Sequence, residues 1–192
     1  MKSSIVFFQF IGFLFVSISG VLLHYAFDWS GNSILIAPFS SVNESIWEHM
    51  KLMFVSLFVY AIIENHVTRG RIESFWCIKL FGVVLGIFLI PMFYYTYTCG
   101  LGITADWVNI ATFFVVAAIV FVVETIHFGS GGVGCGNICG MPYSEFPCLS
   151  QGVALVILVI LASIFVVFTF MPPNLPIFED PVTGTYGFFA RI

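Results

Sequence analysis

Five long apolar stretches dominate the sequence, and short polar segments separate them. A helix that crosses a bilayer needs about 20 predominantly apolar residues. Stretches of about this length cover residues 5–27, 45–63, 75–97, 107–126 and 152–171. The pattern therefore predicts an all-α, polytopic integral membrane protein with five transmembrane helices.

The composition supports this prediction. Hydrophobic residues make up 60% of the 192 residues, and charged residues only 8%. A water-soluble domain cannot bury that much apolar surface, so membrane lipids are the expected surroundings. The net charge is -4 and no basic cluster occurs, which argues against a nucleic-acid partner.

The positions of the cations predict an orientation. Four of them lie near the N-terminus and around the second loop: Lys2, Arg69, Arg71 and Lys79. Because cytoplasmic loops carry an excess of Lys and Arg, we expect a cytoplasmic N-terminus. Three segments should then lie outside: residues 28–43, 98–106 and 172–192. Arg191 is the one cation that argues against this orientation.

We expect residues 1–171 to form one transmembrane domain and residues 172–192 to form a tail on its outer face. The tail contains four prolines, which are incompatible with a sixth spanning helix. Its aromatic side chains suit a membrane interface. The tail is predicted to cover the outer face as a lid, or else to lie on the surface as a chain end.

Polar side chains are concentrated at the start of the second apolar stretch. Ser41 and Glu44 fit a capping box, in which the two side chains bond the first helical amides. Lys51 would lie about 10 Å deeper than Glu44 along a helix, where burial of an ion costs about 3 kcal/mol. Glu48 precedes Lys51 by three residues and can pair with it, whereas Glu44 and Glu48 repel each other unless a cation or proton intervenes.

The first helix offers a matching polar face, because Ser17, Gly20, His24 and Asp28 recur at helical spacing. Histidine with carboxylates is a ligand set for zinc, manganese or iron. We therefore consider a divalent metal with His24, Asp28, Glu44 and Glu48 as candidate ligands. Candidate catalytic groups are Glu44, Glu48 and His49. Further candidate binding residues are Asn43, Trp47, Lys51, Asp180 and Tyr186. The alternative is a well-formed helix entrance without a ligand.

A second, weaker cluster is possible at the other end of the helices. Glu124 and His127 form an E-x-x-H pair, and Glu64 lies at the corresponding end of the second helix. The favoured interpretation is that these helix-end side chains extend to water.

Two further patterns carry less weight. Gly82 and Gly86 form G-x-x-x-G, which allows close approach of two helices within one chain or across a homo-oligomer. Cys135, Cys139 and Cys148, together with His127, offer the ligand types of a zinc site. Their spacing alone fixes no geometry, so an ordinary glycine-rich loop is the favoured interpretation.

Four stretches resemble a family of uncharacterised bacterial multi-pass membrane proteins: residues 24–32, 38–52, 90–98 and 168–187. The motifs that carry the resemblance are N-E-S-x-W-E-H at residues 43–49 and D-P-x-T-G-T-Y-G at residues 180–187. The resemblance implies a small polytopic protein of the plasma membrane and brings no activity with it.

Three classes of function follow from these observations. The preferred one is a polar pocket at the outer leaflet that serves a metal-dependent enzyme acting on a lipid-like substrate, or that binds a cation or solute without chemistry. The second is a subunit of a small-solute or ion transporter, in which buried acids relay protons or cations. The third is a structural or assembly protein that needs no ligand.

Overall fold

The computed structural model describes residues 2–68, 74–103, 105–129 and 150–190. Within these residues there are five helices that are long and apolar enough to cross a membrane, and no strands. They are α1 (Lys2–Trp29), α2 (Ile46–Thr68), α3 (Phe75–Tyr95), α4 (Asp106–Gly129) and α5 (Gln151–Phe170). The predicted all-α fold with five long apolar helices is confirmed.

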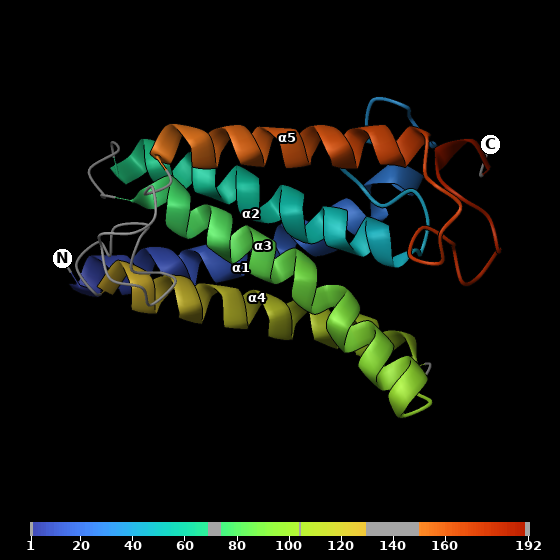
Figure 1. Ribbon diagram of the computed structural model, residues 1–192, viewed down its shortest axis with the longest axis horizontal. Helices are drawn as coiled ribbons and strands as arrows, with labels where there is room; N and C mark the ends of the chain where they lie inside the picture. Colours follow the sequence, from blue (N-terminus) through green and yellow to red (C-terminus); the bar gives the residue numbers. More distant parts are fainter. Residues whose placement is uncertain (1, 69–73, 104, 130–149, 191–192) are drawn as a thin grey trace, which may run out of the picture.

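The helices pack side by side as a bundle (Figure 1). The helix α3 crosses the bundle diagonally and contacts α2, α4 and α5, while α1 packs against α2 and α4. A π-helical turn, η1 (Thr96–Gly100), extends α3. The connection between α1 and α2 and the segment after α5 meet at one end of the bundle, here called the tail end. The chain begins at the opposite end, here called the N-terminal end.

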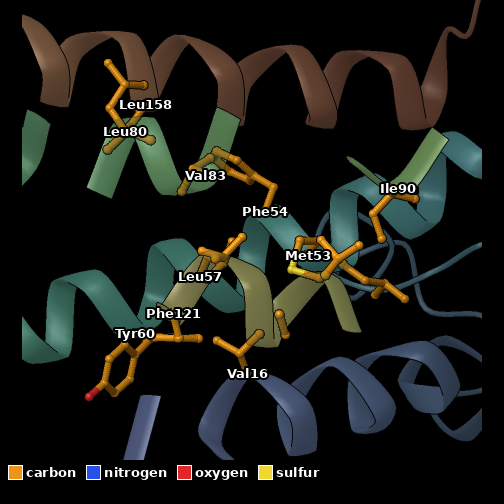
Figure 2. Packing of buried hydrophobic residues seen from close by; sticks show 14 of the residues in the cluster. Val16, Met53, Phe54, Leu57, Tyr60, Leu80, Val83, Ile90, Phe121 and Leu158 are labelled. Carbon is orange, nitrogen blue, oxygen red and sulfur yellow. The ribbon is translucent and has the colours of Figure 1, made fainter. Parts of the chain in front are cut away.

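All five helices contribute to one apolar core (Figure 2). Val16 of α1, Met53 of α2, Val83 of α3, Phe121 of α4 and Leu158 of α5 are all buried in it. Large apolar side chains also cover the outside of the bundle, among them Phe10, Phe88, Ile126 and Val156. Helices that are apolar on every side are typical of membrane spans, because lipid replaces water around them.

Glycines let the helices approach closely. A Cβ atom at Gly82 would lie 2.2 Å from Oε1 of Glu124, and one at Gly86 would lie 3.2 Å from Met53. Both glycines of the G-x-x-x-G pattern therefore face α4 and α2 within one chain. A homo-oligomer stays a prediction, and its contact would have to use another surface.

The helix α2 begins close to the start of the apolar stretch and later than the capping-box pattern at Ser41 predicted. Its first residue is Ile46, and the backbone N–H of Glu48 donates to Oγ of Ser45 at 3.4 Å. Ser41 instead donates its hydroxyl to the carbonyl oxygen of Asn43 at 2.6 Å. The predicted capping box at Ser41 and Glu44 is wrong, because both residues precede the helix and Ser45 supplies the cap.

The segment after α5 packs on the tail end of the bundle. The backbone N–H of Trp47 donates to the carbonyl oxygen of Ile177 at 3.0 Å, and its indole lies 4.6 Å from the ring of Phe178, centroid to centroid. Phe188, in the short helix η3 (Phe188–Ala190), is buried against Phe27. Residues 171–190 therefore cover the start of α2 and the end of α1.

Candidate metal centre and buried ion pairs

Two histidines and one glutamate converge at the tail end of the bundle. His24 lies near the end of α1, Glu44 precedes α2, and His49 lies in the first turn of α2. Nε2 of His24 is 3.5 Å from Oε1 of Glu44, and Nε2 of His49 is 3.8 Å from Oε2 of the same carboxylate. One potential ligand atom from each residue lies within 4.8 Å of the other two.

The imidazole of His49 is held in one orientation. Its Nδ1 lies 2.9 Å from the carbonyl oxygen of Ser45, so Nδ1–H donates there. Ser45 is itself positioned by a hydrogen bond from its backbone N–H to Oδ1 of Asn43 at 3.0 Å. In a neutral imidazole with its hydrogen on Nδ1, Nε2 carries a lone pair. Nε2 and the Glu44 carboxylate are then two hydrogen-bond acceptors that face each other. A cation or a proton between them relieves this repulsion.

A cavity of about 400 Å³ opens beside these three residues. The side chains of His24, Glu44 and His49 line it and are 23%, 47% and 19% exposed. Other polar groups of the wall come from α1, α3, η1 and α4: Tyr25, Tyr94, Tyr97, Asn109 and Thr112. The rest of the wall is mostly apolar, with Ile90, Ile110 and Phe113 among its residues. The volume is in the range of pockets that hold small molecules.

The other predicted metal ligands lie elsewhere. Asp28 is exposed in the last turn of α1 and is not one of the three converging residues. Glu48 is buried and lies 2.6 Å from Nζ of Lys51. The structure thus divides the predicted ligand set, with Glu44 beside the histidines and Glu48 in an ion pair.

The ion pair of Glu48 and Lys51 joins three segments of the chain. Besides Glu48, Nζ of Lys51 donates to the carbonyl oxygen of Ala37 at 3.0 Å and to Oγ1 of Thr169 at 2.9 Å. Oε2 of Glu48 also accepts the backbone N–H of Val42 at 3.0 Å. All three ammonium protons therefore have acceptors, and the connection that carries Glu44 is tied to α2 and α5.

The second predicted cluster is buried, not solvated. Glu64 and Glu124 are 2% and 1% exposed, and Nζ of Lys79 lies 2.7 Å from the first carboxylate and 2.6 Å from the second. The interpretation that these acids extend to water is therefore wrong, because Lys79 compensates them inside the bundle. His127 does not join them. Its Nδ1 lies 2.8 Å from the carbonyl oxygen of Val123.

The remaining candidate residues have structural contacts. Asn43 positions Ser45, as described above, and Trp47 packs among aromatic rings of α5 and the tail. Asp180 is buried and accepts the backbone N–H of Val182 at 2.9 Å. Tyr186 donates its hydroxyl to Glu179 at 3.1 Å. The last two shape the turn that brings residues 181 and 182 to the cavity wall. The three loop cysteines lie outside the described residues.

The model of a family of unknown function, DUF6512, matches residues 2–188. The chain belongs to this family. The expected membership of an uncharacterised family is therefore confirmed. No curated protein and no solved structure matches the chain.

Sequence reasoning missed several groups that matter in this DUF6512 protein. At the level of the sequence, Lys79 serves only to predict the orientation and is not paired with Glu64 and Glu124, although it lies inside the third apolar stretch. Gln9 was not considered, yet its Nε2 donates to Glu64 at 2.9 Å. A signal was available, since an intramembrane lysine requires an acidic partner. Asn109 gave no such signal, because only the folded structure brings it to the cavity, where it accepts a hydrogen bond from the Tyr97 hydroxyl.

Proposed function

We propose that this DUF6512 protein is a membrane-embedded, metal-dependent hydrolase, and that His24, Glu44 and His49 bind its divalent ion. The observation that carries the proposal is the convergence of three ligand atoms within 4.8 Å from two helices and the segment between them. Two histidines and one glutamate are the protein ligands of a large group of catalytic zinc sites. Such sites keep a further position for water or substrate.

The distances from the two imidazoles to the carboxylate support a zinc ion. Ligand atoms about 2.1 Å from a tetrahedral ion are separated by about 3.4 Å. The two Nε2-to-carboxylate distances of 3.5 and 3.8 Å, each to a different oxygen of Glu44, are close to this value, and the three ligand atoms together lie within 4.8 Å of one another. The hydrogen bond from His49 Nδ1 to Ser45 adds support, because histidine ligands usually donate their second N–H to a carbonyl or carboxylate.

The cavity supports an amphiphilic substrate. Its polar groups include the candidate ligands and the Tyr97 hydroxyl, which donates to Asn109, while its other walls are largely apolar. A lipid-like molecule would place its acyl or isoprenoid part against Ile90 and Phe113 and its polar linkage near the histidines. A bound ion supplies an activated water and polarises the bond to be hydrolysed.

The expected setting is the plasma membrane with the N-terminus in the cytoplasm. The candidate metal centre would then face the outer leaflet. The five apolar helices and the apolar outer surface of the bundle support insertion in a membrane.

The first test measures metal. Protein purified in detergent would be loaded with zinc, dialysed and assayed by elemental mass spectrometry, as wild type and as the Glu44→Gln and His49→Gln variants. We expect about one zinc ion per wild-type chain and loss in both variants. Asp28→Asn is the matched control, because it removes a nearby exposed carboxylate and should leave the metal content unchanged.

Two outcomes would contradict the proposal. One is wild-type protein that binds no zinc after loading. The other is equal metal loss in Asp28→Asn. If wild type binds the metal as expected, a second experiment tests the enzymatic part. Hydrolysis of ester-linked and phosphoester-linked lipids in vesicles should depend on the metal. Metal binding without such turnover would refute the enzymatic part alone.

A further inference from the structure

A second cluster of charges lies toward the N-terminal end of the bundle. Glu64 of α2, Lys79 of α3 and Glu124 of α4 meet there, with side chains 1–3% exposed. Gln9 of α1 joins them through its hydrogen bond to Glu64. Four helices therefore contribute one polar side chain each. The cluster is separate from the candidate metal centre, since Glu64 follows His49 by 15 residues, or about 22 Å along α2.

The charges of this cluster do not balance. Two carboxylates and one ammonium group leave a net charge of -1 when all three are ionised. Lys79 is the only basic side chain within 4.0 Å of either carboxylate in the described part of the chain. Four aromatic rings surround its Nζ at 5.4–5.7 Å from their centroids: Tyr60, Phe75, Phe121 and Phe128. They stabilise the cation but bring no compensating charge.

Three other polar side chains toward this end of the bundle already have hydrogen-bond partners, and His66 of α2 is exposed. The Tyr60 hydroxyl donates to the carbonyl oxygen of Phe8, and His127 is bonded to its own helix at Val123. On α5, the side chain of Gln151 accepts the backbone N–H of Trp76 at 3.0 Å. A net charge in so dry a place is strongly unfavourable, so the carboxylates need one more positive charge. A single proton shared by the two acids supplies it.

Gln9 gives independent support. Its Nε2 donates to Oε1 of Glu64 at 2.9 Å, while its own Oε1 is buried and has no hydrogen-bond partner among the described residues. The two ends of an amide differ in donor and acceptor character. As placed, Gln9 makes the hydrogen bond that an ionised Glu64 accepts. Turned over, its Oε1 would accept the proton of a protonated Glu64. The Gln9 side chain can therefore hydrogen-bond Glu64 whether its carboxyl group is ionised or protonated.

We propose that Gln9, Glu64, Lys79 and Glu124 form a site that binds one exchangeable proton inside the helix bundle. The site does not depend on the metal centre. The proton makes the cluster neutral, and its release leaves a negative charge in the contact between α1, α2, α3 and α4. Proton binding is thereby linked to the packing of four helices.

Infrared spectroscopy of the full chain in lipid nanodiscs tests this proposal. A protonated carboxyl group has a C=O stretching band that an ionised carboxylate lacks. We expect this band in wild type at neutral pH and its loss in both Glu64→Gln and Glu124→Gln. Each variant keeps one carboxylate, but Lys79 then neutralises it without a proton. The control Glu44→Gln should keep the band. Lys79→Met should increase it about twofold, because both acids then need a proton.

Three results would overturn the proposal. The first is a wild-type spectrum without the band. The second is a band that keeps its intensity in Glu64→Gln or Glu124→Gln, since the proton would then belong to a different group. The third is a wild-type band that appears only when sodium is removed, which would make a metal cation the compensating charge. The two glutamine variants decide the question even if Lys79→Met fails to fold.

Discussion

Replacement of Lys51 by Met should destabilise the bundle strongly. Methionine keeps the length and the apolar stem of lysine but removes the ammonium group. Three acceptors lose their donor: Glu48 at 2.6 Å, the Ala37 carbonyl at 3.0 Å and Thr169 Oγ1 at 2.9 Å. Glu48, which is 2% exposed, would be left as an uncompensated charge.

The magnitude follows from this burial. Removal of one partner of a buried ion pair typically costs about 3–5 kcal/mol. The backbone N–H of Val42 still donates to Glu48, so we expect about 3–4 kcal/mol for Lys51→Met, within that range. The double variant Lys51→Met/Glu48→Gln removes both charges, and its amide can still accept from Val42. The free energy of unfolding of the double variant should be about 1–3 kcal/mol higher than that of Lys51→Met, the usual coupling energy of residues in direct contact.

The assay is reversible unfolding in mixed micelles, followed by helical circular dichroism and tryptophan fluorescence. Trp47 reports on this region, because its ring lies 4.7 Å from that of Phe165. Glu44→Gln is the control, since its exposed carboxylate should change stability by less than about 0.5 kcal/mol. Two results would contradict a buried ion pair of Glu48 and Lys51. One is a loss of unfolding free energy below about 1 kcal/mol for Lys51→Met, and the other is a double variant no more stable than the single one.

Three further predictions concern packing and metal binding. Gly82→Ala should lower the thermal midpoint far more than Gly86→Ala. The new Cβ would lie 2.2 Å from Glu124 in the first variant and 3.2 Å from a methionine side chain in the second. Equal midpoints by circular dichroism would contradict the close packing of α3 on α4. Phe178→Ala should cost about 3–5 kcal/mol and expose the tail to protease, because the buried ring packs on Trp47; an unchanged cleavage rate would argue against this docking. Zinc affinity should fall on acidification from about pH 7.5 to about pH 5.5, because protons compete for the imidazole ligands, and titration calorimetry measures this; an affinity that does not change would exclude histidine ligation.

The spans were predictable because their apolar composition leaves few alternatives. The fifth stretch, predicted at 152–171, is Gln151–Phe170 in the structure. The second was predicted to end at residue 63, but α2 continues to Thr68. The error has a physical cause. Glu64 has the polarity of a helix end, yet the bundle neutralises it through Lys79, a contact between residues far apart in sequence.

The candidate site was predictable only as a set of residues. His24, Glu44 and His49 were all named, but the sequence did not predict which carboxylate joins the histidines. That choice depends on where α2 begins. With the cap at Ser45, Glu44 lies outside the helix and reaches both imidazoles, while Glu48 turns toward Lys51. A shift of a few residues in a helix start thus decides which acid belongs to the site.

The two ends of α2 also fix its rotation about its own axis. A helix that is apolar on every side can turn among similar neighbours at little cost in packing. Lys51 and Glu64 point in directions about 140° apart around α2, as follows from 13 residues at 3.6 residues per turn. One is held by α5, and the other by α1 and α3. Rotation of α2 about its axis by one residue, about 100°, would break the contacts of Lys51 and of Glu64 together. The buried charges therefore fix one rotational position for the helix that carries most of the polar side chains.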